Sequence, residues 1–183
     1  MEPLARELAT IHEIVNEIVQ EVINHFEPDR QGGYFCLAEQ DGTPIQVVLT
    51  VKDSIFPVIL PAEKKAKYCR LAQEKNFRLG QHPEHSSSFQ SASNNEKDEK
   101  YPGAIRGRAF LYSFSGFKAL VDEATVLIAA VAVGDLDEAK AYKIAEISSN
   151  YFFDNILYSN RIQKLLKTVR RPVSLAIAAH TLQ

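Results

Sequence analysis

The chain has 183 residues, of which 45% are apolar and 24% are charged, with a formal net charge of −2. These values are typical of a globular chain of one domain, which can fold without a disulfide or a structural metal. A net charge near zero creates no large field for attracting nucleic acid or an anionic membrane, so we expect neither as a partner.

The cysteines and the hydropathy pattern indicate the compartment. Cys36 and Cys69 stand among apolar or helix-forming neighbours and are interpreted as two buried thiols of a reducing environment, not as a disulfide framework. The first residues form no positively charged leader, and the longest apolar run, 124–133, is about half of what a membrane span requires. We therefore expect a cytoplasmic protein.

The first predicted element is an amphipathic helix over residues 4–26, because apolar residues recur every three or four positions. They are Leu4, Leu8, Ile11, Val15, Ile18, Val22 and Phe26. A seven-residue spacing within this stripe also allows contact with a second subunit, although packing on the chain's own sheet is the simpler use. His12 and His25 lie on or beside the stripe and are interpreted as structural.

Two β-rich runs, residues 34–39 and 43–52, flank Asp41 and Gly42. An Asp-Gly pair between such runs predicts a β-hairpin. The next residues, 53–60, contain a proline and are predicted to be an edge strand or an irregular connection.

A second helix is predicted over residues 62–77, with Pro61 at its first position. Its basic residues Lys64, Lys67 and Arg70 are interpreted as a solvated face, with contact to an anionic ligand as the alternative.

Residues 80–100 are polar and lack a hydrophobic period, which predicts a mobile loop. His82 and His85 stand three positions apart in it and are candidates for binding haem or a metal. The alternative is that they are incidental histidines in a polar loop.

Residues 103–134 are predicted to form a glycine turn, a strand over 109–114, a Ser-Gly turn and a helix that Phe117 opens. The helix is apolar almost all round, so we expect it to be covered on more than one side. Asp122 and Glu123 fall in its first turns, where acids are stabilised by the helix dipole, and a catalytic role is the alternative.

The Ser115-Gly116 turn before this helix predicts outward-facing N–H groups, a generic arrangement for binding anions. Arg106 and Arg108 could hold a carboxylate or phosphate through paired hydrogen bonds. Ser113 and Ser115 do not fit the G-x-S-x-G motif, so a serine hydrolase is not expected.

The remaining residues are predicted to be helical, with Asp135 and Glu138 as a capping box, helices over 139–147 and 151–169, and an apolar tail over 173–182. We expect a core domain over 1–134 and a helical extension over 135–183. The extension would pack on the core or at an oligomer interface.

The order helix, hairpin, helix, loop, glycine turn, strand, Ser-Gly and helix resembles the haem-binding HbpS/GlcG-like family, which includes the carboxy-terminal domain of PduO-type proteins. The family's motifs match Gly103, Gly107, Ser115, Gly116, Asp122 and Glu123, and its helical lysine matches Lys65 or Lys67. Ala104 stands where the family has a second glycine, and the family's Gly-x-Ser-Gly is here Ser-Phe-Ser-Gly with the bulky Phe114, which implies a narrower or differently shaped pocket.

The resemblance implies an α/β (α+β) fold with a mainly antiparallel sheet flanked by helices, here with an extra C-terminal helical extension, and homo-oligomers. It also implies a small-ligand-binding protein for haem or a related small anionic metabolite. The predicted ligand-binding residues are Gly103, Arg106, Arg108, Ser115, Gly116 and Asp122. The alternative is an oligomeric scaffold or protein-interaction module without catalytic activity. No residue set defines a reaction, so an enzyme activity is left open.

Overall fold

The computed structural model describes residues 3–53 and 60–169. Its centre is an antiparallel four-stranded sheet in the order β2-β1-β4-β3. The strands are β1 (Gly32–Ala38), β2 (Pro44–Val51), β3 (Ala104–Arg106) and β4 (Leu111–Ser115). The predicted α+β class with a mainly antiparallel sheet is thus confirmed.

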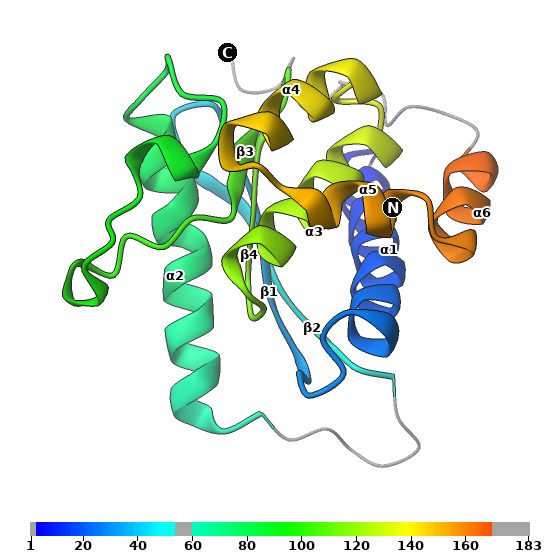
Figure 1. Cartoon of the computed structure of the whole chain (residues 1–183), viewed down its shortest axis with the longest axis horizontal. Helices are drawn as coiled ribbons and strands as arrows, with labels where there is room; N and C mark the ends of the chain where they lie inside the picture. The colour runs from blue at the N-terminus through cyan, green and yellow to red at the C-terminus, as the bar shows by residue number, and fades with distance from the viewer. Residues whose placement is uncertain (1–2, 54–59, 170–183) are drawn as a thin grey trace.

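Helices cover both faces of this sheet (Figure 1). They are α1 (Pro3–His25), α2 (Ala62–Gly80), α3 (Ala119–Ala132), α4 (Glu138–Ser148), α5 (Tyr151–Leu157) and α6 (Asn160–Thr168). Helix α2 lies on one face and α1 and α3 lie on the other, while α4 and α5 pack on α3 and α6 packs on α1. Among the described residues, no helix combines the length and apolar character needed to cross a membrane.

The predicted hairpin is confirmed, because β1 and β2 pair in antiparallel register around the Asp41-Gly42 turn. The Asp41 carboxylate accepts a hydrogen bond from the Thr43 N–H at 2.8 Å, which fixes the turn. Residues 54–59, most of the predicted edge strand or connection, lie outside the described part of the chain.

The two faces of the sheet differ in polarity. The α1 and α3 face carries the main apolar core, which continues into α5 and α6 through Phe153, Ile156, Leu157 and Ile162. The C-terminal helices therefore share one core with the sheet. Burying each of these side chains contributes roughly 1.5–3 kcal/mol to the free energy of folding. The α2 face holds only a small apolar cluster and leaves room for buried polar groups.

Helix α3 is buried almost all round, as its apolar sequence predicts, because β4, α1 and α5 cover different sides of it. It begins at Ala119, two residues later than predicted, since Phe117 lies in the turn after β4.

Two details of the C-terminal prediction are wrong. Asp137, not Asp135, caps α4 by accepting a hydrogen bond from the Lys140 N–H at 2.8 Å. The Asp135 carboxylate instead accepts hydrogen bonds from the N–H groups of Ala109 and Phe110, just before β4. The stretch 151–169 is not one helix: it is divided after Leu157, and Ser159 caps α6. The predicted tail over 173–182 lies outside the described residues.

The polar segment 80–100 is held by buried hydrogen bonds, which its composition did not predict. It contains two short 3₁₀ helices, η1 (Ser88–Ser91) and η2 (Glu96–Asp98). Arg78 of α2 donates to the Ser88 carbonyl oxygen at 3.0 Å and to the Tyr101 carbonyl oxygen at 2.6 Å. The middle of the segment and the residue that follows it are thereby fixed to α2, while the mobility of the segment stays a prediction.

Candidate functional site

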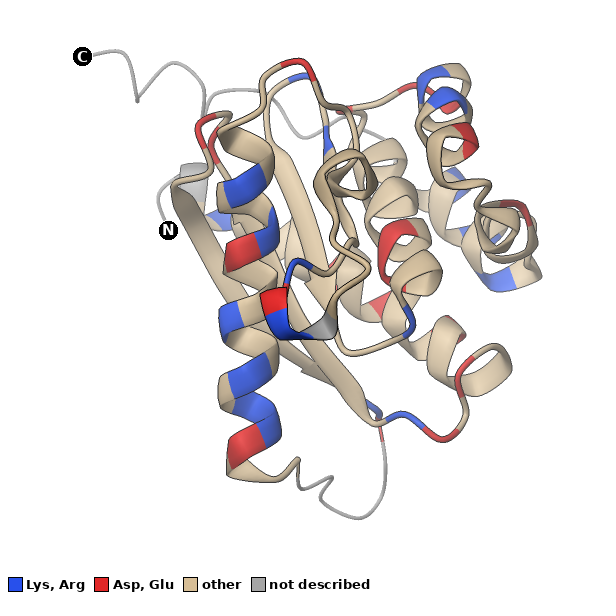
Figure 2. Ribbon diagram, turned by 60° about the vertical axis from the view of Figure 1, so that its left-hand side comes forward, with Lys and Arg blue, Asp and Glu red and all other residues tan. Residues whose placement is uncertain are grey.

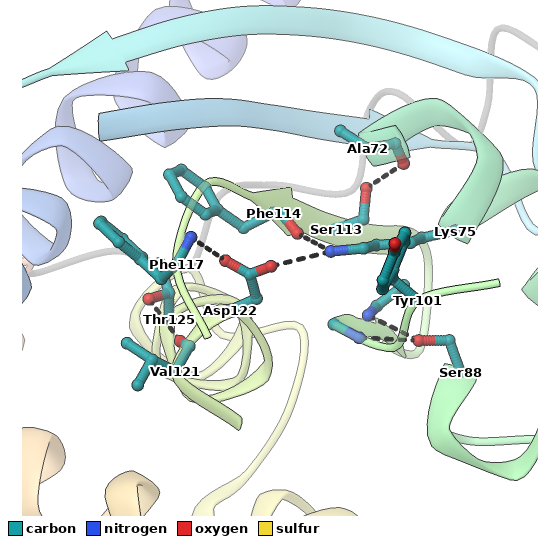
Figure 3. Close-up of polar contacts among 12 residues, drawn as sticks. Ala72, Lys75, Ser88, Tyr101, Ser113, Phe114, Phe117, Val121, Asp122 and Thr125 are labelled. Atoms are coloured by element: carbon teal, nitrogen blue, oxygen red, sulfur yellow. Dashed lines mark hydrogen bonds and ion pairs between the residues drawn. The ribbon is translucent and has the colours of Figure 1, made fainter. Parts of the chain in front are cut away.

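A buried ion pair joins α2 to the start of α3 beneath the end of β4 (Figure 3). The Lys75 Nζ donates to Asp122 Oδ2 at 2.8 Å and to the Phe114 carbonyl oxygen at 2.6 Å. The side chains of Lys75 and Asp122 are 1% and 4% exposed. A lysine ammonium has three donors, so within the described residues one N–H of Lys75 is left for a further partner.

Asp122 also organises the turn between β4 and α3. Its Oδ1 accepts a hydrogen bond from the Phe117 N–H at 2.9 Å. Burial raises the pKa of Asp122 to about 6, while Lys75 and the N–H groups of Phe117 and Gly116 pull it down. Desolvation is the larger effect, because the carboxyl group is removed from water almost completely.

The chain approaches this ion pair so closely at Gly103 that no side chain fits there. Gly103 has a φ of +118°, and a Cβ atom would lie 2.7 Å from Asp122 Cβ and 2.9 Å from Lys75 Nζ. The Ser88 Oγ holds this backbone in place by accepting from the N–H groups of Gly103 and Ala104, at 3.0 and 2.8 Å. Gly103 therefore closes the site as a packing residue.

The raised pKa of Asp122 predicts a specific dependence of stability on pH. The native state binds this proton more tightly than the unfolded chain, where the pKa has its ordinary value of 3.8. The free energy of unfolding should therefore rise by about 1 kcal/mol from this group as the pH falls from about 7 to about 5. Urea denaturation at several pH values measures the rise, which the Asp122→Asn variant should lack. Identical pH profiles for the two proteins would contradict the prediction.

A pocket of about 280 Å³ opens above the ion pair. Its lining comes from α2, from the chain before β3 and from the β4–α3 turn: Arg30, Lys67, Tyr68, Leu71, Lys75, Tyr101, Pro102, Ser115, Gly116, Phe117, Ala119 and Asp122. A second pocket of about 260 Å³ shares Arg30, Tyr68 and Gly116 with it and adds Lys64. We call the first of these the α2 pocket.

Three cationic side chains line the α2 pocket, against one carboxylate. Lysine and arginine residues recur along α2, as Figure 2 shows. Lys67 is exposed, and its Nζ lies 5.9 Å from the centre of the Tyr101 ring. The Arg30 Nε lies 3.8 Å from Glu27. Lys67 is thus open to a ligand, Arg30 shares its charge with Glu27, and Lys75 offers the one N–H that Asp122 and the Phe114 carbonyl oxygen leave.

Four of the predicted ligand-binding residues gather here. Ser115, Gly116 and Asp122 line the α2 pocket, and Gly103 packs directly under it. Gly116 must be a glycine, because a Cβ atom would lie 2.5 Å from the Gly32 carbonyl oxygen of β1. This part of the prediction comes together because Ser115 ends β4 where α3 is about to begin.

The other two predicted ligand-binding residues, Arg106 and Arg108, lie at the opposite end of β4. Arg106 pairs with Leu111, the first residue of β4, about 13 Å along the strand from Ser115. With Lys140 and Lys143 of α4, the two arginines line a separate pocket of about 280 Å³. The predicted anion-binding residues thus lie in two separate pockets, at opposite ends of β4.

The guanidinium of Arg106 donates its hydrogen bonds to other groups of the protein. It donates to the carbonyl oxygens of Gln40, Leu79, His82 and His85 and to the side chain of Gln40. Arg108 donates to the Gly134 carbonyl oxygen at 2.6 Å and is more exposed. Arg106 therefore positions the chain after α2.

The other polar residues considered for catalysis have structural partners. The Ser113 Oγ donates to the Ala72 carbonyl oxygen at 2.6 Å. Glu123 is fully buried and accepts hydrogen bonds from Ser87, Ser148 and Asn150. Burial raises the pKa of Glu123, and these donors oppose the shift. These contacts support the structural interpretation of both residues.

His82 and His85, the predicted haem or metal ligands, lie together just after α2, where Glu84 joins them.

Cys36 is buried and Cys69 partly buried, and both are free thiols.

Sequence reasoning missed Lys75, although α2 carries a signal for it. Lys75 stands four residues after Leu71 and four before Leu79, on the buried face of the helix. A lysine at a core position of a helical stripe rarely lies there without a buried partner. That pattern could have identified Lys75, but not Asp122 as its partner.

Comparisons with protein-family models, with curated proteins and with solved structures found no match for the chain. The resemblance to the HbpS/GlcG-like family therefore stays a prediction.

Proposed function

We propose that the protein binds a small organic or inorganic anion in the α2 pocket. The observation that carries the proposal is the convergence of Arg30, Lys67 and Lys75 on a pocket of about 280 Å³ next to the start of α3. Lys118, the N-cap residue of α3, makes no side-chain capping hydrogen bond, and backbone N–H groups at a helix start favour anions. Asp122 already uses the Phe117 N–H in this way.

The size of the pocket favours a small ligand. Sites for drug-sized ligands occupy roughly 300–1,000 Å³, and the α2 pocket lies just below that range. A dicarboxylate or phosphate suits it better than a porphyrin does. Haem binding, the other ligand implied by the resemblance, stays a prediction for this chain.

Calorimetric titration with malonate and with inorganic phosphate tests the proposal. Lys67→Ala and Arg30→Ala should each weaken binding about tenfold, because each removes a cation that pairs with the ligand. Lys164→Ala on α6 removes the same charge from an exposed position on the far side of α1 and should leave the affinity unchanged. If all three variants weakened anion binding equally, the effect would come from the net charge of the protein, which would contradict a specific site.

The alternative function, an interaction module, has one observation in its favour. The large exposed apolar side chains of the described residues are Phe77, Ile147, Tyr151 and Tyr158. The last three lie between the final turn of α4 and the residue that follows α5. Light scattering tests this alternative, since a monomer at high concentration would count against self-association.

A further inference from the structure

The turn after α2 brings two imidazoles and a carboxylate together. The His82 Nδ1 lies 3.3 Å from Glu84 Oε1, and the His85 Nε2 lies 3.4 Å from the same oxygen. The His85 N–H donates to the His82 carbonyl oxygen at 2.9 Å, so a tight backbone turn sets this spacing. Within residues 3–53 and 60–169, this is the one group of three such donors close enough to share an ion.

The distances suit a tetrahedral metal ion. Bonds of about 2.0–2.1 Å from zinc to nitrogen and oxygen place neighbouring tetrahedral ligand atoms about 3.3 Å apart. The two contacts to Glu84 already have this length. The three ligand atoms lie within 4.8 Å of one another, so the remaining pair has to close by about 1.5 Å at most to complete the geometry.

The donor set selects the class of ion. Imidazole nitrogens suit zinc, nickel and copper, whereas magnesium and calcium take oxygen ligands. We propose that His82, Glu84 and His85 form a binding site for a divalent transition-metal ion of the zinc class. Three protein ligands leave one coordination position open for water or a small ligand, as in catalytic zinc sites.

The backbone of this site is fixed before any ion binds. The guanidinium of Arg106 donates to the carbonyl oxygens of His82 and His85, at 3.2 and 2.9 Å, and to that of Leu79 at 2.6 Å. Such preorganisation lowers the entropic cost of binding. Arg106 is thus a positioning residue for this site, and the Glu84 carboxylate offsets its positive charge.

The site is open to solvent and separate from the α2 pocket. The side chains of His82 and Glu84 are 44% and 63% exposed, while His85 is 19% exposed. An ion can reach them directly, with His85 as the inner ligand. None of the three lines the α2 pocket, so the two sites can be tested independently.

Titration of the chelator-treated full chain with Co²⁺, followed by its visible absorption, tests the proposal, with Zn²⁺ added in competition. We expect one ion per chain, displaced by Zn²⁺. His82→Ala and His85→Ala should each lower the affinity at least tenfold, since even outer-shell changes typically cost about 10–100-fold. Thermal unfolding of each metal-free variant checks that the fold is intact.

His25→Ala is the matched control, because its Nε2 lies 3.6 Å from Glu21 on α1 in a pair that no third such donor joins in the described part of the chain. It should leave the Co²⁺ affinity unchanged. Unchanged affinity in the folded His82→Ala/His85→Ala double variant would overturn the proposal, as would equal loss in His25→Ala. If haemin gave a Soret band that depends on these histidines while Co²⁺ gave no visible absorption, the proposal would be wrong and the ligand of the site would be haem.

Discussion

Replacing Lys75 with alanine should lower the free energy of unfolding by about 3–5 kcal/mol, because Asp122 loses its buried partner and a cavity takes the place of the lysine side chain. The Phe114 carbonyl oxygen loses its donor at the same time. Urea denaturation measures the loss. Lys65→Ala, on the same helix but partly exposed, should change stability by no more than about 0.5 kcal/mol.

The pairing itself is tested by a double-mutant cycle. Lys75→Met keeps most of the side-chain volume, and Asp122→Asn keeps an oxygen for the Phe117 N–H. The double variant should be more stable than the sum of the two single losses predicts, with a coupling of about 1–3 kcal/mol. Simple additivity would mean that the two charges do not stabilise each other.

Replacing Glu123 with alanine should cost about 3–5 kcal/mol, since three donors, the buried Ser87 and Asn150 and the partly buried Ser148, would lose their acceptor. Those donors belong to three different parts of the chain: Ser87 before η1, Ser148 at the end of α4 and Asn150 at the start of α5. The change should therefore loosen the polar segment and the C-terminal helices together. Hydrogen exchange of both regions, with urea denaturation, measures this.

Glu146→Ala is the control for Glu123, because Glu146 is exposed on α4 and should change stability by no more than about 0.5 kcal/mol. Increased exchange confined to one of the two regions in Glu123→Ala would show that Glu123 does not couple them.

The local elements could be read from the sequence because their signals are local. The Asp41-Gly42 turn sets the β1–β2 hairpin, and the apolar period of α1 sets its buried face. The apolar character of α3 correctly predicted a helix covered on several sides. Its start was misplaced by two residues, because Phe117 is apolar like the helix it precedes.

The candidate site could be predicted only in part, because strand pairing decides which residues meet. Gly103 and Arg106 are three residues apart, yet β3 is extended between them, so each lies near a different end of β4. No local pattern reveals that separation. Lys75 and Asp122 are 47 residues apart in the sequence, and their contact depends on both elements packing at the end of β4.

Glu84 shows the same limit at short range. The sequence predicted His82 and His85 as a pair of candidate ligands, because imidazoles are common metal ligands. Glu84 was not among the residues predicted to bind a ligand, because nothing in the sequence distinguishes it from the other acids of this polar segment. The turn closed by the His85 N–H directs the Glu84 carboxylate toward both imidazole rings. The three side chains become a group of possible metal ligands only in that conformation.

The most direct test of the anion pocket is an NMR titration of ¹⁵N-labelled protein with malonate. We predict saturable shifts of the Gly116, Phe117 and Ala119 amides, which lie in the β4–α3 turn at the pocket. These shifts should weaken in Lys67→Ala. Shifts confined instead to the pocket of Arg108, Lys140 and Lys143, or no saturable shift anywhere, would contradict the proposed function.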